Sequence, residues 1–509
     1  MSQISILDCT LRDGGYINDW NFGADAISYI LDKLERSGIE FIEVGFIKDV
    51  EYSRDRTVFP NIEKISEVIR GKSRTPKYVG MIDMSAPVSL DCLPARSKDD
   101  IDAIRVIFKQ DRIDEGYEYA KELIKRGYMV MIQLVSTNTY TDDELIGVLH
   151  KFNEISPYAL YIVDSLGVIK RKDFTRMVYI ADNNLDKKIV LGYHSHNNLQ
   201  QAMGNAEAFV EFDLDRDILI DACVFGMGRG AGNLNMELFC DYLNDNYRKQ
   251  YMIEPLLEII DRHLNDIYKK NFWGYSLPFY LSALNGCHPN YAKYYNEKGT
   301  LTEKAFNELL KTISVEDKAV YSKIKAEQYY VEYMKNYVDD SEVLDLLSNE
   351  CCGNTVLILG PGNTVEDNPD VVTKCVKLES PIIISVNTDS KIVNADYIFC
   401  SNLRKYVSLK HTSARIITTS NIKGVNKDCL ILNYASYISN NSFVVDNAGL
   451  MIIKIMKSVG AKKILLAGLD GYGESTPDYD KINSAMCDEL QAIGKNTNII
   501  FITKSKYEM

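Results

Sequence analysis

The feature that most constrains the fold is a regular alternation from residue 4 to about residue 245 of short apolar runs and segments with helical periodicity. Continuous apolar strands separated by helices are typical of a parallel sheet that is buried on both faces. Eight strand–helix units in about 240 residues match the size of a (β/α)8 barrel, which we prefer to an open doubly wound sheet. The eight runs span residues 4–10, 39–46, 78–82, 103–108, 130–135, 160–163, 189–193 and 218–225.

The rest of the 509-residue chain divides into two further regions. Residues 251–345 have no strand-like runs and are dense in aromatic residues, so we expect a helical extension packed on the barrel. After an acidic stretch at residues 339–352, strands and helices alternate again. The expected architecture is therefore a barrel at residues 1–250, the helical extension, and a Rossmann-like α/β domain at residues 353–509.

Charge, hydropathy and cysteine usage argue against several classes of protein. The chain has 58 Lys and Arg against 71 Asp and Glu, a net charge of −13, and no long basic run. These features disfavour nucleic-acid partners and anionic membrane surfaces. No apolar stretch reaches the roughly 18 residues that a membrane-spanning helix needs, and we see no secretory signal. The 11 cysteines are scattered, as in reduced cytoplasmic proteins, so we expect a cytoplasmic protein.

Two histidines give the strongest local signal. His194 and His196 lie at the end of the seventh run, in the sequence GYHSHNN. Alternate residues of a strand point to the same face, so both imidazoles project together at the carboxyl end, where such barrels carry their active sites. Paired imidazoles suit a borderline divalent metal. A pair of hydrogen-bonded structural histidines fits this motif equally well when it is taken alone.

The segment after the first run adds a carboxylate. Asp13 follows Arg12 in the sequence DCTLRDGG and is expected at the same rim as the histidines. A carboxylate with two imidazoles makes a three-ligand face that leaves positions open for substrate. A guanidinium beside a metal suits an oxyanion or enolate. Alone, however, Arg-Asp-Gly is more often an exposed turn.

A glycine-rich loop, GMGRGAGN, follows the eighth run and ends at Asn233. Asn233 could supply a carbonyl oxygen to a metal or cap the next helix, and the cap is the simpler interpretation. A dinucleotide site is disfavoured, because no βαβ continuation with an acidic end follows the loop.

Together these motifs resemble the HMGL-like, pyruvate-carboxylase-type family of metal-dependent barrels. The family includes hydroxymethylglutaryl-CoA lyase, the isopropylmalate and homocitrate synthases, and 4-hydroxy-2-oxovalerate aldolase, whose branch this sequence resembles most. The resemblance covers about residues 1–295. It rests on TLRDG at 10–14, IEVGF at 42–46, DSLG at 164–167, HSHN at 194–197 and GAGN at 230–233.

The resemblance implies a metal-dependent aldolase or lyase acting on a 2-oxo acid, with Mn²⁺, Mg²⁺ or Zn²⁺ as cofactor. Arg12 would stabilise the enolate, and Glu43 would order the site through Arg12 or a water, although a buried structural carboxylate fits Glu43 equally well. We also expect a homo-oligomer. The implied metal ligands are Asp13, His194 and His196, with Asn233 as a possible fourth.

One position departs from the family pattern. The aldolase branch places a histidine base three residues after the metal-binding aspartate, and this chain has Tyr16 there. A tyrosine, with an ordinary pKa near ~10, is a poor base at neutral pH. His288 and Tyr291 are candidates to reach the site from the helical extension, although an interface role is the more common one for such residues.

The second α/β domain has a strand followed by a Gly-x-Gly turn, in the sequence VLILGPGNT at residues 356–364. With SVN at 385–387 and GLDG at 468–471, it faintly resembles Rossmann-type nucleotide-sugar transferases and pterin-diphosphokinase-like domains of surface-glycan pathways. That resemblance implies a nucleotide or phosphosugar ligand. A structural or oligomerising role is at least as compatible with the motif.

Four other functions are compatible with parts of the pattern. A Claisen-type acyl-CoA synthase is close, but the barrel shows no basic patch for CoA phosphates. An amidohydrolase would carry its H-x-H after the first strand. An Fe(II) oxygenase would usually carry its carboxylate two residues from a histidine on an all-β scaffold. A surface-glycan protein active only through its second domain also remains open.

Overall fold

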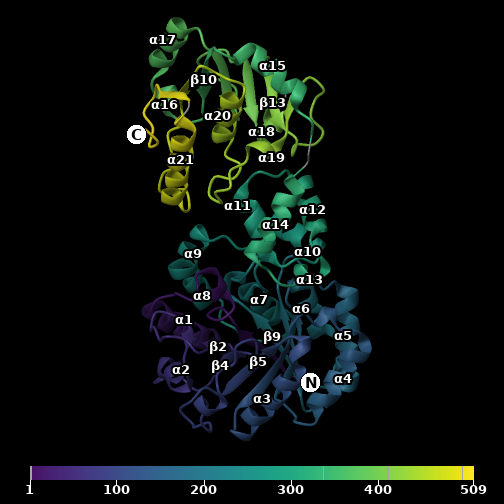
Figure 1. The fold of residues 1–509 in the computed structure, drawn as a ribbon. Helices are drawn as coiled ribbons and strands as arrows, with labels where there is room; N and C mark the ends of the chain where they lie inside the picture. The colour runs from purple at the N-terminus through teal and green to yellow at the C-terminus, as the bar shows by residue number, and fades with distance from the viewer. Residues whose placement is uncertain (1–2, 336–337, 410–411, 496, 509) are drawn as a thin grey trace. The chain divides into compact units, whose positions relative to one another are not determined.

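The computed structural model describes residues 3–335, 338–409, 412–495 and 497–508. The chain forms two compact units, shown in Figure 1. The first comprises Met1–Lys293 and Lys318–Val320, and the second comprises Tyr294–Asp317 and Tyr321–Met509. The boundary between them falls within helix α11 (Pro289–Lys298), inside the region expected to form the helical extension.

The first unit contains the expected barrel. Eight parallel strands pair in sequence, and the ring closes because β1 pairs with both β2 and β9. A short ninth strand, β3 (Val58–Phe59), pairs with the end of β2 and lies outside the eight expected runs. The barrel strands are β1 (Ile4–Asp8), β2 (Phe41–Ile47), β4 (Lys77–Asp83), β5 (Ala103–Phe108), β6 (Met129–Leu134), β7 (Ala159–Asp164), β8 (Val190–Ser195) and β9 (Ile218–Ala222).

Helices follow the strands as the alternation predicts, with one exception. No α-helix lies between β4 and β5, where the described chain has only the one-turn 3-10 helix η2 (Leu90–Cys92). Pro87 and Pro94 lie in that connection, and proline disrupts helix interiors. The barrel helices are α1 (Ala24–Ser37), α2 (Ile62–Ile69), α3 (Ile113–Lys125), α4 (Asp142–Asn153), α5 (Arg171–Asn184), α6 (Ala202–Glu211) and α7 (Met236–Tyr247).

Residues 251–345 carry helices and no strand among those described. None of the helices in the described part of the chain is long and apolar enough to cross a membrane. The helices here are α8 (Glu254–Ile259), a π-helical turn η6 (Ile260–Leu264), α9 (Asn265–Lys270), α10 (Leu277–Leu284), α11, α12 (Glu303–Thr312), α13 (Val315–Lys318), α14 (Lys323–Met334) and α15 (Ser341–Cys351).

The second unit holds a seven-stranded parallel sheet, as expected for an α/β domain. Its order is β14-β13-β12-β11-β10-β15-β16, so the chain winds outward from β10 to β14 and then crosses to β15 on the other side of β10. Ligands of such sheets bind beyond the carboxyl ends of the strands where the order reverses. The strands are β10 (Thr355–Leu359), β11 (Ile382–Val386), β12 (Tyr397–Cys400), β13 (Arg415–Thr419), β14 (Leu430–Leu432), β15 (Lys463–Ala467) and β16 (Asn498–Phe501).

The helices of this domain connect the strands of the sheet. They include α20, which begins at the carboxyl edge because it leads back into β15. The helices are α16 (Thr364–Asp367), α17 (Pro369–Glu379), α18 (Leu403–Ser408), α19 (Tyr434–Tyr437), α20 (Ala448–Ser458) and α21 (Tyr479–Gly494).

Candidate metal centre

Three sequence-predicted ligands converge at the carboxyl end of the barrel. The Oδ2 atom of Asp13, in the loop after β1, lies 3.6 Å from Nε2 of His194 and 3.7 Å from Nε2 of His196. The two imidazoles stand at 89° to each other with centroids 5.4 Å apart. All three side chains are buried. The strand register thus brings together residues that are about 180 positions apart in sequence.

The donor set fits a divalent cation. Oδ1 of Asp13 accepts a hydrogen bond from Nη1 of Arg12 at 2.9 Å, whereas its buried Oδ2 has no hydrogen-bond partner among the described residues. Burial raises the pKa of Asp13, but Arg12 and the two imidazoles outweigh burial, and the pKa lies well below its ordinary value. Burial lowers the pKa of His196 to about 3, which keeps this imidazole neutral, as a metal ligand must be.

Asn233 lies next to His196. It forms an isolated bridge with His196, and its Nδ2 donates to the carbonyl of Met227 at 2.9 Å. Its Oδ1 is buried and has no hydrogen-bond partner among the described residues. The N-cap of α7 is Asn235, so Asn233 does not cap that helix. A Cβ at Gly228 would come within 2.2 Å of the Asn233 side chain, which explains the need for glycine there.

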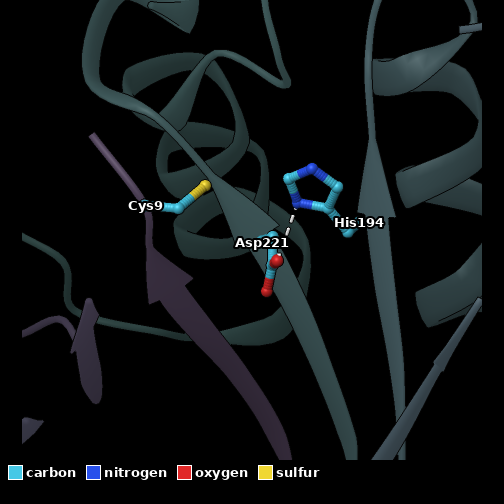
Figure 2. Close-up of side chains that lie close together, drawn as sticks. All are labelled: Cys9, His194 and Asp221. Atoms are coloured by element: carbon cyan, nitrogen blue, oxygen red, sulfur yellow. Dashed lines mark hydrogen bonds and ion pairs between the residues drawn. The ribbon is translucent and has the colours of Figure 1, made fainter. Parts of the chain in front are cut away.

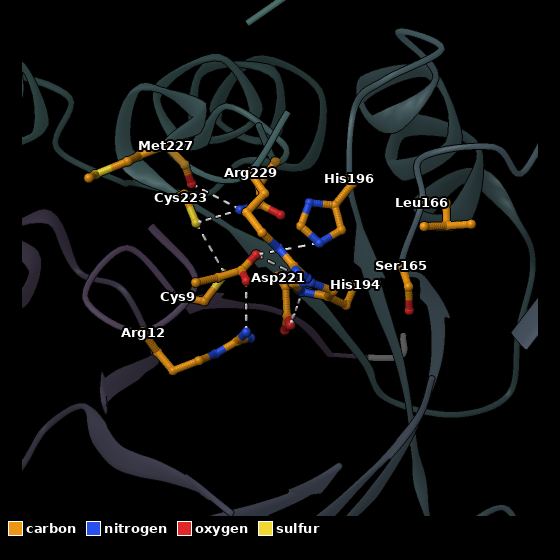
Figure 3. Close-up of polar contacts among 12 residues, drawn as sticks. Cys9, Arg12, Ser165, Leu166, His194, His196, Asp221, Cys223, Met227 and Arg229 are labelled. Atoms are coloured by element: carbon orange, nitrogen blue, oxygen red, sulfur yellow. Dashed lines mark hydrogen bonds and ion pairs between the residues drawn. The ribbon is translucent and has the colours of Figure 1, made fainter. Parts of the chain in front are cut away.

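Asp221 orients His194. Its Oδ2 lies 2.8 Å from Nδ1 of His194, so Nδ1–H donates to the carboxylate and Nε2 is the nitrogen that faces Asp13. Figure 3 shows these side chains projecting from neighbouring strands, β8 and β9. Burial raises the pKa of Asp221, but Arg105 and His194 lower it below its ordinary value. A carboxylate behind a ligating histidine is a common feature of metal sites.

A fully buried guanidinium connects the two sides of the site. Arg105, on β5, has no exposed surface and donates from Nη1 to Glu43 at 3.0 Å and from Nη2 to Asp221. The same Oε2 of Glu43 accepts from Nε of Arg12 at 2.8 Å. Glu43 therefore holds Arg12 beside Asp13 through a direct ion pair, one of the two roles that the sequence left open.

A second cluster of possible ligands lies next to the first. The potential ligand atoms of Cys9, His194 and Asp221 also lie within 4.8 Å of one another. Figure 2 shows these three side chains close together. The Sγ atoms of Cys9 and Cys223 are 3.3 Å apart, and burial together with this contact raises the pKa of Cys9 well above its ordinary value. A thiol binds metal as the thiolate, so this cluster suits a cation less well than the first.

Tyr16 borders the site within an aromatic cluster. It lies in the 3-10 helix η1 (Gly14–Ile17), and its ring packs edge-on against Trp20 and Phe46, with centroids 4.8 and 6.1 Å away. The guanidinium carbon of Arg229 lies 4.2 Å from the centre of the Tyr16 ring. Burial raises the pKa of Tyr16, so its hydroxyl stays protonated at neutral pH.

His288 lies next to Arg229, with its Nε2 atom 3.3 Å from Nη1 of the guanidinium. Burial, reinforced by Arg229, lowers the pKa of His288 to about 3. Tyr291 is buried, and its hydroxyl lies 3.5 Å from the carbonyl of Val320. The structure thus groups His288 with Arg229 and Tyr16.

Three residues near the site were not predicted from the sequence: Arg105, Asp221 and Arg229. The first two stand inside the apolar runs AIRVIF and ILIDA, where a single charged residue is itself a signal of a buried ionic partner. Arg229 lies in the glycine-rich loop, where a charged residue gives no such signal.

Several known proteins are similar to the barrel region of this chain. Residues 3–252 match the family model described as HMGL-like. Oxaloacetate decarboxylase of Mycobacterium tuberculosis is 26% identical over 234 residues, 46% of this chain and 67% of the relative. A 4-hydroxy-2-oxovalerate aldolase of Pseudoalteromonas translucida is 24% identical over 245 residues, 48% of this chain and 70% of the relative.

Solved structures share the fold. The carboxyl transferase domain of Rhizobium etli pyruvate carboxylase, solved with oxamate and biotin, aligns with a TM-score of 0.50 at 11% identity. The alignment covers 69% of this chain and 66% of that one.

The contact between Asp221 and His194 predicts a specific effect on metal affinity. Asp221→Asn should weaken Mn²⁺ binding by about 10–100-fold, because it removes the negative charge that makes the imidazole a better donor. Titration calorimetry on the metal-free protein would measure this. Asp215→Asn, at an exposed position before the same strand, is the matched control. Equal affinities in the two variants, with both folded by circular dichroism, would contradict the orienting role.

Proposed function

Residues 3–252 form an HMGL-like domain, and from this premise we propose that the barrel cleaves or forms a carbon–carbon bond of a 2-oxo acid through a metal-stabilised enolate. The family match and the names of the relatives support a metal-dependent lyase of 2-oxo acids. The proposal of an enolate mechanism rests on one observation. Asp13, His194 and His196 converge beside Arg12, which is held in place by ion pairs.

We propose Asp13, His194, His196 and Asn233 as the metal ligands. A bound divalent cation would supply Lewis-acid polarisation of the 2-oxo group. Arg12 uses Nε for Glu43 and Nη1 for Asp13, which leaves Nη2 to stabilise the enolate oxygen.

Tyr16 is better suited to donate a proton or a hydrogen bond than to remove a proton. In an aldol cleavage, it would orient the 4-hydroxyl of the substrate. A decarboxylation fits this residue more directly. When a 2-oxo acid with a carboxylate on C3 loses CO2, the enolate forms and no base is needed. The Tyr16 hydroxyl could then protonate C3. We therefore keep decarboxylation as a second candidate, favoured because the Tyr16 hydroxyl beside the site stays protonated at neutral pH.

The second domain has a cavity of about 370 Å³ at the carboxyl edge of its sheet. It is lined by residues that follow three adjacent strands, among them Gly362, Asn387 and Ser401, and by the first turn of α20, which has no acidic residue. The Oδ1 atom of Asn387 is buried without a hydrogen-bond partner among the described residues. These features support a nucleotide or phosphosugar as ligand of this domain.

Pyruvate release from 4-hydroxy-2-oxovalerate and from oxaloacetate, with Mn²⁺, Mg²⁺ or Zn²⁺, would test the proposed activity of the barrel.

Arg12→Lys should retain the metal and lose most turnover, because lysine keeps the charge but lacks the planar fork that engages Glu43 and Asp13. The loss should appear in kcat more than in KM. An unchanged kcat at full metal occupancy would refute the role given to Arg12.

Tyr16→Phe separates the two candidate reactions. If Tyr16 only orients the 4-hydroxyl, the variant should lose about one hydrogen bond, ~0.5–1.5 kcal/mol, and keep its pH profile. If Tyr16 protonates the enolate during decarboxylation, CO2 release should persist while ketonisation of the product slows. Abolished aldol cleavage at every pH, with normal metal and pyruvate binding, would instead show that Tyr16 is the base.

For the second domain, the full-length protein should be stabilised by a nucleotide sugar such as UDP-glucose in a thermal-shift assay. Asn387→Asp should weaken this effect, because it places a negative charge at the cavity. Asp389→Asn, a nearby exposed change, should not. No stabilisation by purine or pyrimidine nucleotides, nucleotide sugars or sugar phosphates at millimolar concentration would contradict the proposal.

A further inference from the structure

Aldol cleavage needs a group that accepts the proton of the 4-hydroxyl, and three residues near the metal centre serve this purpose poorly. The Tyr16 hydroxyl stays protonated at neutral pH, because burial raises its pKa. Burial lowers the pKa of His288 to about 3, and an imidazole with so low a pKa is a weak base. Arg12 keeps its charge at neutral pH and cannot take up a further proton. Another acceptor is therefore needed at this end of the barrel.

Lys48 places a half-buried amine at the same end. It follows β2 directly, so it stands at the carboxyl ends of the strands, where the metal ligands also lie. Its Nζ atom is 4.2 Å from the centre of the Phe46 ring and 5.5 Å from that of Trp20. Among the described residues, no carboxylate oxygen lies within 4.0 Å of this Nζ atom. The charge of Lys48 is therefore not fixed by a salt bridge.

The two aromatic rings link Lys48 to the metal-binding loop. The guanidinium carbon of Arg12 lies 5.7 Å from the centre of the same Phe46 ring. Nε1 of Trp20 donates to the carbonyl of Arg12 at 2.7 Å. The Trp20 ring also packs on Gly15, where a Cβ would come within 2.1 Å of it. Lys48 thus lies beside the segment that carries Arg12 and the metal-binding aspartate.

The surroundings of Lys48 accommodate both of its protonation states. Burial lowers the pKa of Lys48; Asp83, at the end of β4, opposes this shift, and Arg12 reinforces it. The faces of the two aromatic rings, in turn, attract the ammonium form. A residue that exchanges protons with a substrate must alternate between the amine and the ammonium, and neither form is excluded here.

We propose that Lys48 is the acid–base residue of the aldol reaction, an inference that rests on the proposed function for the position of the substrate. In cleavage, the Lys48 amine takes the proton of the 4-hydroxyl while the C3–C4 bond breaks and its electron pair moves onto C3 to form the enolate. The aldehyde leaves, and the Lys48 ammonium then gives its proton to C3, which yields pyruvate and restores the amine. The flexible lysine side chain lets one amine reach both atoms in turn.

Two substitutions separate proton transfer from charge. Lys48→Met removes the amine, and Lys48→Arg keeps a cation over the Phe46 ring but cannot act as a base at neutral pH. Both should lower kcat for pyruvate release from 4-hydroxy-2-oxovalerate by about 100-fold or more, with unchanged Mn²⁺ affinity. Ethylamine in the assay should restore part of the activity of Lys48→Met, which a purely structural defect would not allow. Lys109→Met, at an exposed position directly after β5, is the matched control and should leave kcat unchanged.

A partial reaction tests the same role without any aldehyde. Enolisation of pyruvate is the reverse of the last step, so Lys48 should remove a proton from C3 and exchange it with solvent. In D2O with Mg²⁺, mass spectrometry on the full-length protein's reaction should show deuterium entering the methyl group of pyruvate. The rate should fall by about 100-fold in Lys48→Met and stay unchanged in Lys109→Met.

The outcomes separate this inference from the proposed function. Exchange that depends on Lys48, without cleavage of 4-hydroxy-2-oxovalerate, would count against the proposed substrate and leave the role of Lys48 standing. Absence of exchange in the unaltered protein, or exchange or cleavage that survives Lys48→Met, would overturn the inference.

Discussion

The candidate site depends on one buried interaction, the ion pairs of Arg105 with Glu43 and Asp221. A charged residue without exposed surface is costly to bury, and it is tolerated here because carboxylates on two other strands meet it. The two carboxylates in turn hold the groups proposed to do the chemistry: Glu43 fixes Arg12, and Asp221 fixes His194. A guanidinium inside the barrel therefore determines the geometry at its rim.

Much of the barrel could be predicted from sequence, because its strands are buried on both faces and read as continuous apolar runs. The bounds expected for the fourth run, 103–108, match β5. The missing helix after β4 and the extra strand β3 were not predicted, since a two-residue strand and an irregular connection carry no periodic signal. Gln200 is in the left-handed region with a φ of 57°, a conformation that does not continue a right-handed helix, and α6 starts after it, at Ala202.

The predicted metal ligands converge because each is tied to the carboxyl end of a parallel strand, and strand direction places those ends on one rim. The residues that hold these ligands in place could not be predicted from strand direction. Arg105 and Asp221 meet across the barrel interior, and such pairing depends on the register of non-adjacent strands, which one sequence does not specify. The grouping of Arg229 with His288 likewise depends on how the glycine-rich loop folds against the segment before α11.

The position of a bound cation tests the proposed metal centre most directly. Crystals of the protein grown with Mn²⁺ and measured above the manganese absorption edge would locate the ion by its anomalous signal. We expect one peak in the barrel, about 2.0–2.3 Å from Asp13 Oδ2 and from Nε2 of both His194 and His196. A peak bonded instead to Cys9, His194 and Asp221, or a barrel without any peak at saturating Mn²⁺, would contradict it.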